Sequence, residues 1–186
     1  SAKAHMSLTL LLDLDDTLLD TNLDAFMPAY FQALARHMAD HTAPDMMLRA
    51  LMSGVNRMNE SEDPTHTLEE IFDADFYAKR GGSKHDFIHV IEEFYDNVFP
   101  QLGKHTRQRP DAVPFVEWAL GRGYRIAIAT DPLFPPKATY HRLRWAGFEP
   151  EQFELVSTFE HFHFSKTYPA YCPGECRETD EMEWLK

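Results

Sequence analysis

Two aspartates, Asp13 and Asp15, stand two residues apart directly after a short apolar run, residues 8–12. An apolar run that ends abruptly in acidic residues is typical of a strand buried on both faces. Two carboxylates brought together at the end of such a strand repel each other unless a positive charge neutralises them. Mg²⁺ prefers oxygen ligands and keeps part of its water shell, so it suits this pair. The alternative is a solvated Asp-rich turn, which explains the acids but not the apolar strand that precedes them.

Two later positions carry groups that could hold a phosphate. Thr130 and Asp131 follow a second apolar run, residues 124–129. A hydroxyl and free N–H groups at the carboxyl end of a strand, facing a helix start, suit a phosphate oxygen. The alternative is a turn in which Thr130 caps a helix. Lys166 lies in a loop beyond a third run, residues 153–157; taken alone, such a lysine is usually solvated.

These side chains depend on strands that must lie next to one another. The runs at 8–12, 124–129 and 153–157 have the length and composition of buried strands. Helical spacing is present at 112–120, before the second run, and at 136–146, between the second and third runs. In parallel sheets, ligands bind beyond the carboxyl ends of the strands. The pattern therefore predicts an α/β fold with a Rossmann-like parallel sheet and a site at one edge of it.

The stretch 21–105 predicts a helical insertion instead, with apolar residues at three- and four-residue steps. Its first helix would be capped by Asn22 or Asp24, and its second follows Pro44. The third and fourth would begin at two capping boxes, Thr67-x-x-Glu70 and the weaker Ser83-x-x-Asp86. Six of the chain's eight methionines fall in the first two helices. We interpret them as packing residues, with a substrate-facing surface as the alternative.

Composition excludes several classes of partner. The chain has 186 residues and a net charge of −12, with 30 acidic and 18 basic residues. Such a surface repels phosphate backbones and anionic lipid, so we expect neither nucleic acid nor membrane as a partner. No apolar run approaches the roughly 18 residues that span a bilayer, and no signal peptide is visible. We therefore expect a cytoplasmic protein.

Two short segments carry little chemistry. Cys172 and Cys176 form a single C-x-x-x-C pair, which is a weak zinc signal without a second pair. Residues 1–5 are interpreted as an expression remnant, with Met6 as the native start.

Taken together, the motifs resemble the haloacid dehalogenase (HAD) superfamily, whose members are mostly Mg²⁺-dependent phosphohydrolases. The resemblance rests on D-x-D-x-T at 13–17, Thr130 after the second strand and Lys166 after the third. It covers about residues 7 to 171, and the first motif is the specific one. The helical insertion looks like the class-one cap of that superfamily. The implied organisation is an α/β core at 6–20 and 106–171, a helical cap at 21–105 and a tail at 172–186.

The resemblance also implies roles for the matching residues. Asp13 would be the nucleophile, forming an aspartyl phosphate, and Asp15 would be the general acid and base. Thr130, with Asp131 beside it, would hold the phosphoryl group, and Lys166 would neutralise charge on that group and on Asp13. Mg²⁺ would be bound by the Asp13 carboxylate and the main-chain carbonyl of Asp15. The dehalogenases of the superfamily lack the second aspartate, so dehalogenation is disfavoured.

The chain departs from the family pattern at three places. Asp131 stands where Asn is common, which puts an extra negative charge near the phosphate, and Thr167 stands where Pro is common. The fourth motif, a carboxylate pair after a fourth strand, is not found. Only 20 residues follow Lys166, and the last acids among them, Asp180, Glu181 and Glu183, are not preceded by a strand-like run. The core therefore looks shortened, and we interpret residues 172–186 as a solvated tail.

The motifs and the missing fourth motif leave two candidate functions. The first is a Mg²⁺-dependent phosphatase acting on a small phosphorylated metabolite, with a helical cap that closes over the site. The second is a HAD-like domain without turnover, acting in binding or assembly. Loss of the fourth strand would also expose an apolar sheet edge, so we expect a homo-oligomer formed through that edge. The candidate substrates are sugar phosphates, phosphoglycolate-like acids and nucleoside monophosphates.

Overall fold

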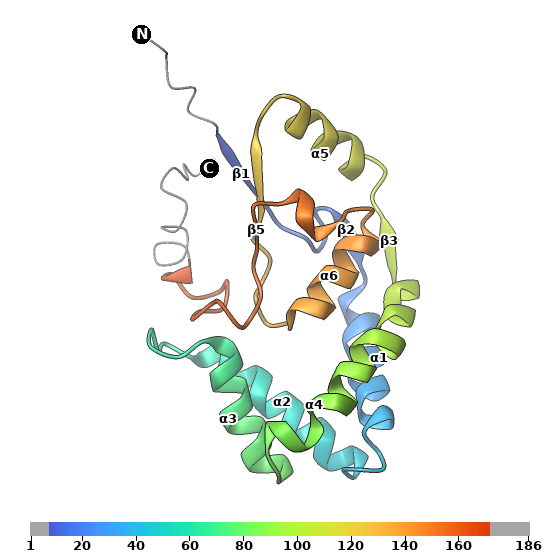
Figure 1. Ribbon diagram of the computed structural model, residues 1–186, viewed down its shortest axis with the longest axis vertical. Coiled ribbons are helices and arrows are strands. Elements are labelled where there is room, and N and C mark those ends of the chain that lie inside the picture. Colours follow the sequence, from blue (N-terminus) through green and yellow to red (C-terminus); the bar gives the residue numbers. More distant parts are fainter. Residues whose placement is uncertain (1–7, 172–186) are drawn as a thin grey trace.

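A small parallel sheet carries the part of the molecule that holds the motifs. The computed structural model describes residues 8–171, and the strand order is β1 (Thr9–Leu12), β4 (Arg125–Ile128) and β5 (Leu155–Val156). Both pairings are parallel, with Leu10 opposite Ile126 and Ile128 opposite Val156. Helices α5 (Ala112–Gly121) and α6 (Pro136–Trp145) pack beside the sheet (Figure 1). The predicted α/β fold with a parallel sheet is confirmed.

The sheet is covered less evenly than the sequence predicts. Ile126 and Ile128 of β4 are fully buried in a cluster with Leu14, Val116 and Leu143. In β1, by contrast, only Thr9 is buried and the three leucines are half-buried. The expectation that the first strand is buried on both faces is therefore wrong. The reason is its position, because β1 is an edge strand in the part of the chain that is described.

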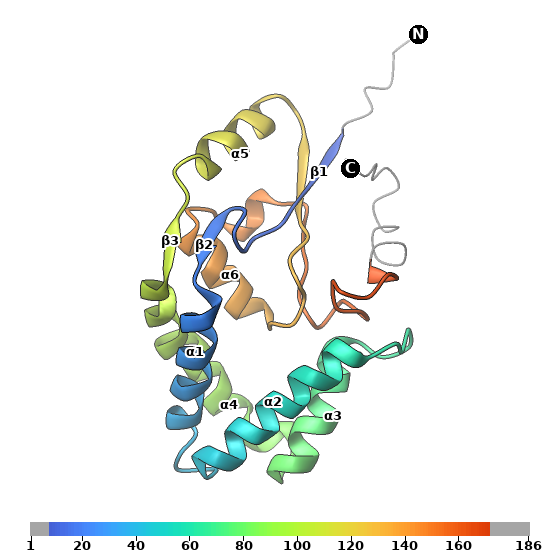
Figure 2. The ribbon, with the colours of Figure 1, turned by 180° about the vertical axis from the view of Figure 1, so that it is seen from behind.

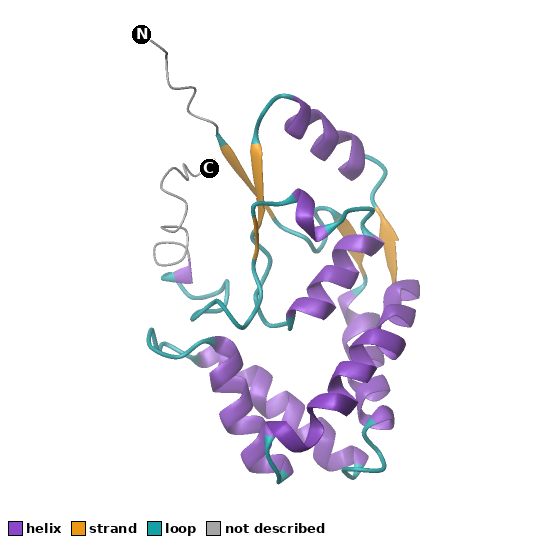
Figure 3. Cartoon of the chain, viewed as in Figure 1, coloured by secondary structure: helices purple, strands orange, loops and turns teal. Residues whose placement is uncertain are grey.

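Four helices form the other end of the molecule, opposite the strands (Figure 3). They are α1 (Leu23–His37), α2 (Pro44–Glu60), α3 (Leu68–Arg80) and α4 (Lys84–Glu93). A π-helical turn (Phe94–Val98) and a 3₁₀ segment (Phe99–His105) lead back to the sheet. Within residues 8–171, no helix is both long and apolar enough to cross a membrane.

The start signals of these helices are confirmed. The side chain of Asn22 accepts a hydrogen bond from the N–H of Ala25. Both capping boxes are present, at Thr67 and at Ser83. The interior combines aliphatic residues with aromatic ones, among them Phe26, Tyr30, Phe94 and Phe99 in one buried cluster. This cluster also includes Ala138 of α6 and is distinct from the one beside the sheet. A third cluster joins Met58 and Leu68 to Phe162 and Phe164.

A second sheet joins the two ends and was not predicted. Strand β2 (Leu19–Thr21) pairs antiparallel with β3 (Thr106–Gln108), so that Thr21 lies opposite Thr106. The chain leaves for the helices and returns from them at this one place (Figure 2). These strands have three residues each and carry no clear alternation, which is why the sequence did not indicate them. The predictions for residues 1–5, for Cys172 and Cys176, and for the tail at 172–186 concern residues outside the described range.

Candidate active site

A tight turn after β1 presents the two aspartates of the first motif. Leu14, between them, has no exposed surface and belongs to the core under the sheet. Asp13 and Asp15, on either side of Leu14, are half-buried. The turn closes through hydrogen bonds from the N–H groups of Leu18 and Leu19 to the carbonyl of Leu14, both of 2.9 Å. The buried leucine therefore fixes where both carboxylates stand.

The conformation of this turn also depends on Asp16, whose φ of 56° lies in the left-handed region. Aspartate and asparagine tolerate this region better than most residues. Arg109 donates a hydrogen bond of 2.8 Å to the carbonyl oxygen of Asp16. The turn is thereby tied to the segment that follows β3.

Lys166 and Asp13 meet at the carboxyl end of the parallel sheet. The Nζ atom of Lys166 lies 3.1 Å from Oδ2 of Asp13, while Oδ1 accepts a 2.8 Å hydrogen bond from the N–H of Leu14. The two side chains keep 39% and 36% of their surface exposed. A ligand can thus reach both groups, and their opposite charges are already paired.

Asp131 connects the loop after β4 to the loop that carries Lys166. Its Oδ1 atom accepts a 3.0 Å hydrogen bond from the main-chain N–H of Lys166. Burial raises the pKa of the Asp131 carboxyl, the hydrogen bond and charge of Lys166 lower it, and the charges of Asp13 and Asp15 raise it further. The structure therefore brings the two motif aspartates, Asp131 and Lys166 together.

Thr130 lies in the same region but is nearly inaccessible, with 2% of its surface exposed. Its carbonyl oxygen accepts hydrogen bonds from the hydroxyls of Ser157, at 2.7 Å, and Tyr171, at 3.0 Å. Helix α6 begins only at Pro136, after Pro135, so a helix start does not face Thr130 as the sequence suggested. Two prolines at that start also remove N–H groups that could bind an anion. The part of Thr130 in phosphate binding stays a prediction.

The structure adds one residue that the motifs did not indicate. Arg142 of α6 has a fully buried side chain, and its Nη2 atom pairs with both carboxylate oxygens of Asp15. Its guanidinium lies over the ring of Phe134, 4.6 Å from the centroid. Within the described part of the chain, its Nε and Nη1 atoms have no hydrogen-bond partner. A sequence signal existed, because Arg142 falls on the apolar stripe of α6 with Ala138 and Leu143.

The donor groups at this site are of the kind that Mg²⁺ takes. A carboxylate at Asp13 and a main-chain carbonyl at Asp15 are hard oxygen donors. Across residues 8–171, no group of three or more His, Cys, Asp or Glu side chains could hold a metal ion. Mg²⁺ commonly binds through one or two carboxylates plus substrate and water, so this open donor set fits it. The acids Asp180, Glu181 and Glu183 lie outside the described residues.

Similarity to known proteins is found among solved structures. No family model matches the sequence, and no curated protein matches it. Among solved structures, the chain is similar to a HAD phosphatase from Thermococcus onnurineus, with 20% identity and a TM-score of 0.39. That similarity covers 81% of this chain and 61% of the other, so the chain spans less than two thirds of that protein.

The chain is also similar to a predicted phosphoglycolate phosphatase from Haemophilus somnus, with 16% identity and a TM-score of 0.45. This similarity covers 94% of the chain and 72% of that protein.

Proposed function

We propose that this chain is a phosphatase that hydrolyses small phosphate monoesters through an aspartyl phosphate on Asp13. The observation that carries the proposal is the pair formed by Lys166 and Asp13, 3.1 Å apart at the carboxyl end of a parallel sheet. A lysine in this position favours the negative charge that develops on a transferring phosphoryl group. The free oxygen lone pairs of Asp13 would attack phosphorus, and the alcohol would leave.

Asp15 is the proposed proton carrier. Its carboxyl would protonate the leaving oxygen and then take a proton from the water that hydrolyses the aspartyl phosphate. Arg142 holds this carboxylate from the side of α6, so it is a positioning residue in this scheme. Asp131 positions the loop of Lys166 by accepting its main-chain N–H. When Mg²⁺ is bound by Asp13 and the carbonyl of Asp15, it supplies further neutralisation of the phosphoryl oxygens.

The test is hydrolysis of phenyl phosphate with and without Mg²⁺ by the wild-type chain and its Asp13→Asn variant. The matched control is Asp16→Asn, since Asp16 is exposed and asparagine tolerates its left-handed backbone. We expect Mg²⁺-dependent turnover, a loss of about three orders of magnitude or more in Asp13→Asn, and near wild-type turnover in the control.

Absence of turnover in folded wild-type protein would overturn the proposal. It would favour the second candidate, a HAD-like domain that acts in binding or assembly without catalysis. Turnover that survives in Asp13→Asn would also overturn it, because the nucleophile would then be another group.

A further inference from the structure

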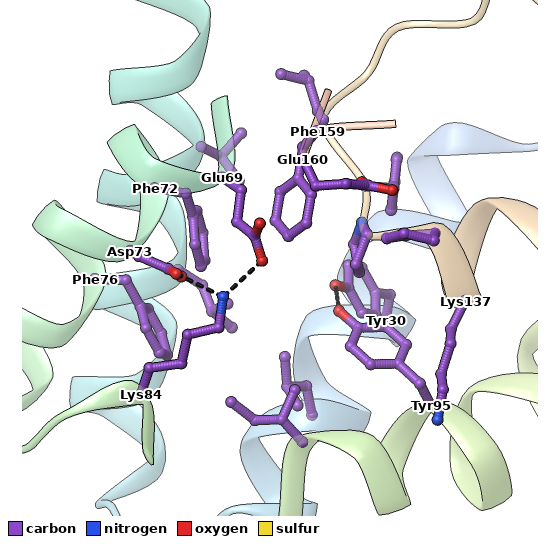
Figure 4. A pocket seen from close by; sticks show the side chains of 18 of the residues that line it. Tyr30, Glu69, Phe72, Asp73, Phe76, Lys84, Tyr95, Lys137, Phe159 and Glu160 are labelled. Atoms are coloured by element: carbon purple, nitrogen blue, oxygen red, sulfur yellow. Dashed lines mark hydrogen bonds and ion pairs between the residues drawn. The ribbon is translucent and has the colours of Figure 1, made fainter. Parts of the chain in front are cut away.

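A cavity of about 470 Å³ lies between the four helices and the loops that follow β4 and β5 (Figure 4). Helices α1 to α4 all contribute to its wall, and residues 133–137 and 159–160 close it on the side of the sheet. Its size falls within the range of pockets that hold small organic ligands.

The wall of this cavity is mostly apolar. Aromatic rings come from both ends of the molecule, including Phe72 and Phe76 of α3, and Phe134 and Phe159 from the two loops. The rings of Phe72 and Phe76 are stacked, with centroids 5.1 Å apart. A surface of this kind favours a ligand with a ring or a branched hydrocarbon body.

The loops that form part of the wall are the loops that carry the proposed active site. The N–H of Leu133, in the wall, donates a 2.9 Å hydrogen bond to the carbonyl of Asp131. The guanidinium over the wall residue Phe134 is that of Arg142, which pairs with Asp15. The N–H of Phe159 donates to the carbonyl of Phe134, so the two loops are also joined to each other. The cavity is therefore built on the same two loops as the site.

The few polar groups in the wall are largely paired among themselves. Lys84 of α4 lies 2.6 Å from Glu69 and 2.8 Å from Asp73, both on α3. The hydroxyls of Tyr30 and Tyr95 share a hydrogen bond of 2.7 Å. Figure 4 shows both sets facing the same space. A substrate rich in hydroxyls would find few partners there, and burying its hydroxyls unpaired would be costly.

The charge of the wall disfavours a second acid on the ligand. It holds four acidic residues and two lysines, and both lysines form ion pairs with carboxylates. The acidic residues are Glu69, Asp73, Glu92 and Glu160, and the lysines are Lys84 and Lys137. The lining thus carries a formal net charge of −2, which repels a carboxylate on the ligand.

We infer that this cavity receives the organic part of the substrate, and that this part is an apolar ring or branched chain without a second acidic group. The inference rests on the proposed phosphatase function, with the phosphate at Asp13 and Lys166. It favours bulky apolar phosphate monoesters over sugar phosphates and over phosphoglycolate-like acids.

The first experiment compares kcat/KM within pairs of substrates that share a leaving-group type. We expect 2-naphthyl phosphate to exceed phenyl phosphate, and hexyl phosphate to exceed glycerol phosphate, each by about 10-fold or more. The kcat/KM for phenyl phosphate bearing a carboxylate in the para position should be lower than that for the same ester bearing an aminomethyl group.

The second experiment fills the cavity. Ile88 lies in the wall on α4, and its neighbour His89 is exposed, so Ile88→Trp is compared with His89→Trp. Val55 and exposed Asn56 provide the same comparison on α2. The wall variants should lower the ratio of kcat/KM for naphthyl over phenyl phosphate by about 10-fold, while the controls keep it. The two independent pairs guard against a single variant that fails to fold.

A third measurement separates the cavity from catalysis. Titration calorimetry of 2-naphthyl phosphate into Asp13→Asn, and into Asp13→Asn with Ile88→Trp, measures binding without turnover. Binding that the added tryptophan weakens about 10-fold supports the cavity inference, even if the wild-type chain does not turn over and the phosphatase proposal fails. Turnover with no apolar preference, and with wall variants equal to their controls, overturns the cavity inference and leaves the phosphatase proposal standing.

Discussion

Asp131 places a third carboxyl beside those of Asp13 and Asp15 and is itself partly withdrawn from water. Burial and these two neighbouring charges raise its pKa above the ordinary value of 3.8. The folded protein therefore binds a proton at Asp131 that the unfolded chain has already lost. Between pH 3.8 and the raised pKa, this group makes stability fall as the pH rises.

The variant Asp131→Asn should remove this pH-dependent loss of stability. The amide oxygen of asparagine can still accept the N–H of Lys166, whereas the charge is gone. We expect a higher melting temperature than wild type at pH 7, and a difference that disappears below pH 3.8. Thermal melts in chelator across this pH range test the prediction, and a variant less stable than wild type at pH 7 would contradict it.

The variant should also lower KM for phenyl phosphate, because it removes a negative charge near the phosphate.

Arg142 is the other residue whose environment determines its role. Its side chain is fully buried, and its partner Asp15 is 22% exposed. Removing one member of a buried ion pair leaves the other uncompensated. We expect Arg142→Met to lower the free energy of unfolding by about 3 kcal/mol.

Two further variants make this measurement specific. Adding Asp15→Asn to Arg142→Met should recover about 1 kcal/mol or more, since the two side chains are in direct contact. Arg144→Met, which breaks only the exposed pair with Glu149, should cost at most about 1 kcal/mol. Urea unfolding curves give all of these values, and equal losses for Arg142→Met and Arg144→Met would refute the buried pair.

At the scale of elements, the start of α3 links the helical end of the molecule to the active-site loops. The N–H groups of Leu68 and Glu69 donate to the carbonyls of Phe162 and Phe159, at 2.7 and 3.0 Å. These are first-turn donors that have no partner within the helix itself. The loop at 159–162 leads to Lys166, so the orientation of α3 is coupled to the position of that lysine.

The capping box at Thr67 is the local device that holds this helix start. The Thr67 side chain accepts the N–H of Glu70, and Glu70 accepts the N–H of Thr67 at 2.8 Å. Thr67→Ala should lower the free energy of unfolding by about 1 kcal/mol. Thr67→Ser should stay close to the wild-type stability, because the serine hydroxyl can form the same cap. Hydrogen exchange at Leu68 to Ile71 should speed up in the alanine variant only. Equal exchange in both variants would argue against the cap.

At the scale of the whole molecule, β1 is the edge at which association with a second copy is expected. The carbonyls of Leu8 and Leu12 accept hydrogen bonds from Arg125 and Ala129 of the β4 segment. Backbone groups of a strand bond alternately to its two sides, so those of Thr9 and Leu11 point away from β4. No strand of the described residues pairs with that side.

Leu11→Pro should weaken association without breaking the ladder to β4, because proline is tolerated at the outer side of an edge strand. We expect sedimentation velocity at micromolar concentration to show an oligomer for the wild-type chain and a shift toward monomer for the variant. Circular dichroism checks that the variant is folded. A wild-type chain that sediments only as monomer would exclude this assembly.

Local signals in the sequence determined the elements and most of the candidate site. The apolar runs predicted β1, β4 and β5, and side-chain caps predicted where α1, α3 and α4 begin, because both signals act within a few residues. The carboxyl ends of parallel strands meet at one edge, so the sequence alone predicts that Asp13, Asp131 and Lys166 lie close together.

Only the tertiary structure decided the contacts that join distant segments. The pairing of β2 with β3, the burial of Arg142 against Asp15 and the aromatic cavity each need residues that lie more than 80 positions apart, or several helices at once. Arg142 shows the reason most directly. Its position on the apolar stripe of α6 indicates burial, but only the packing of α6 against the turn at Asp15 makes it the partner of a carboxylate.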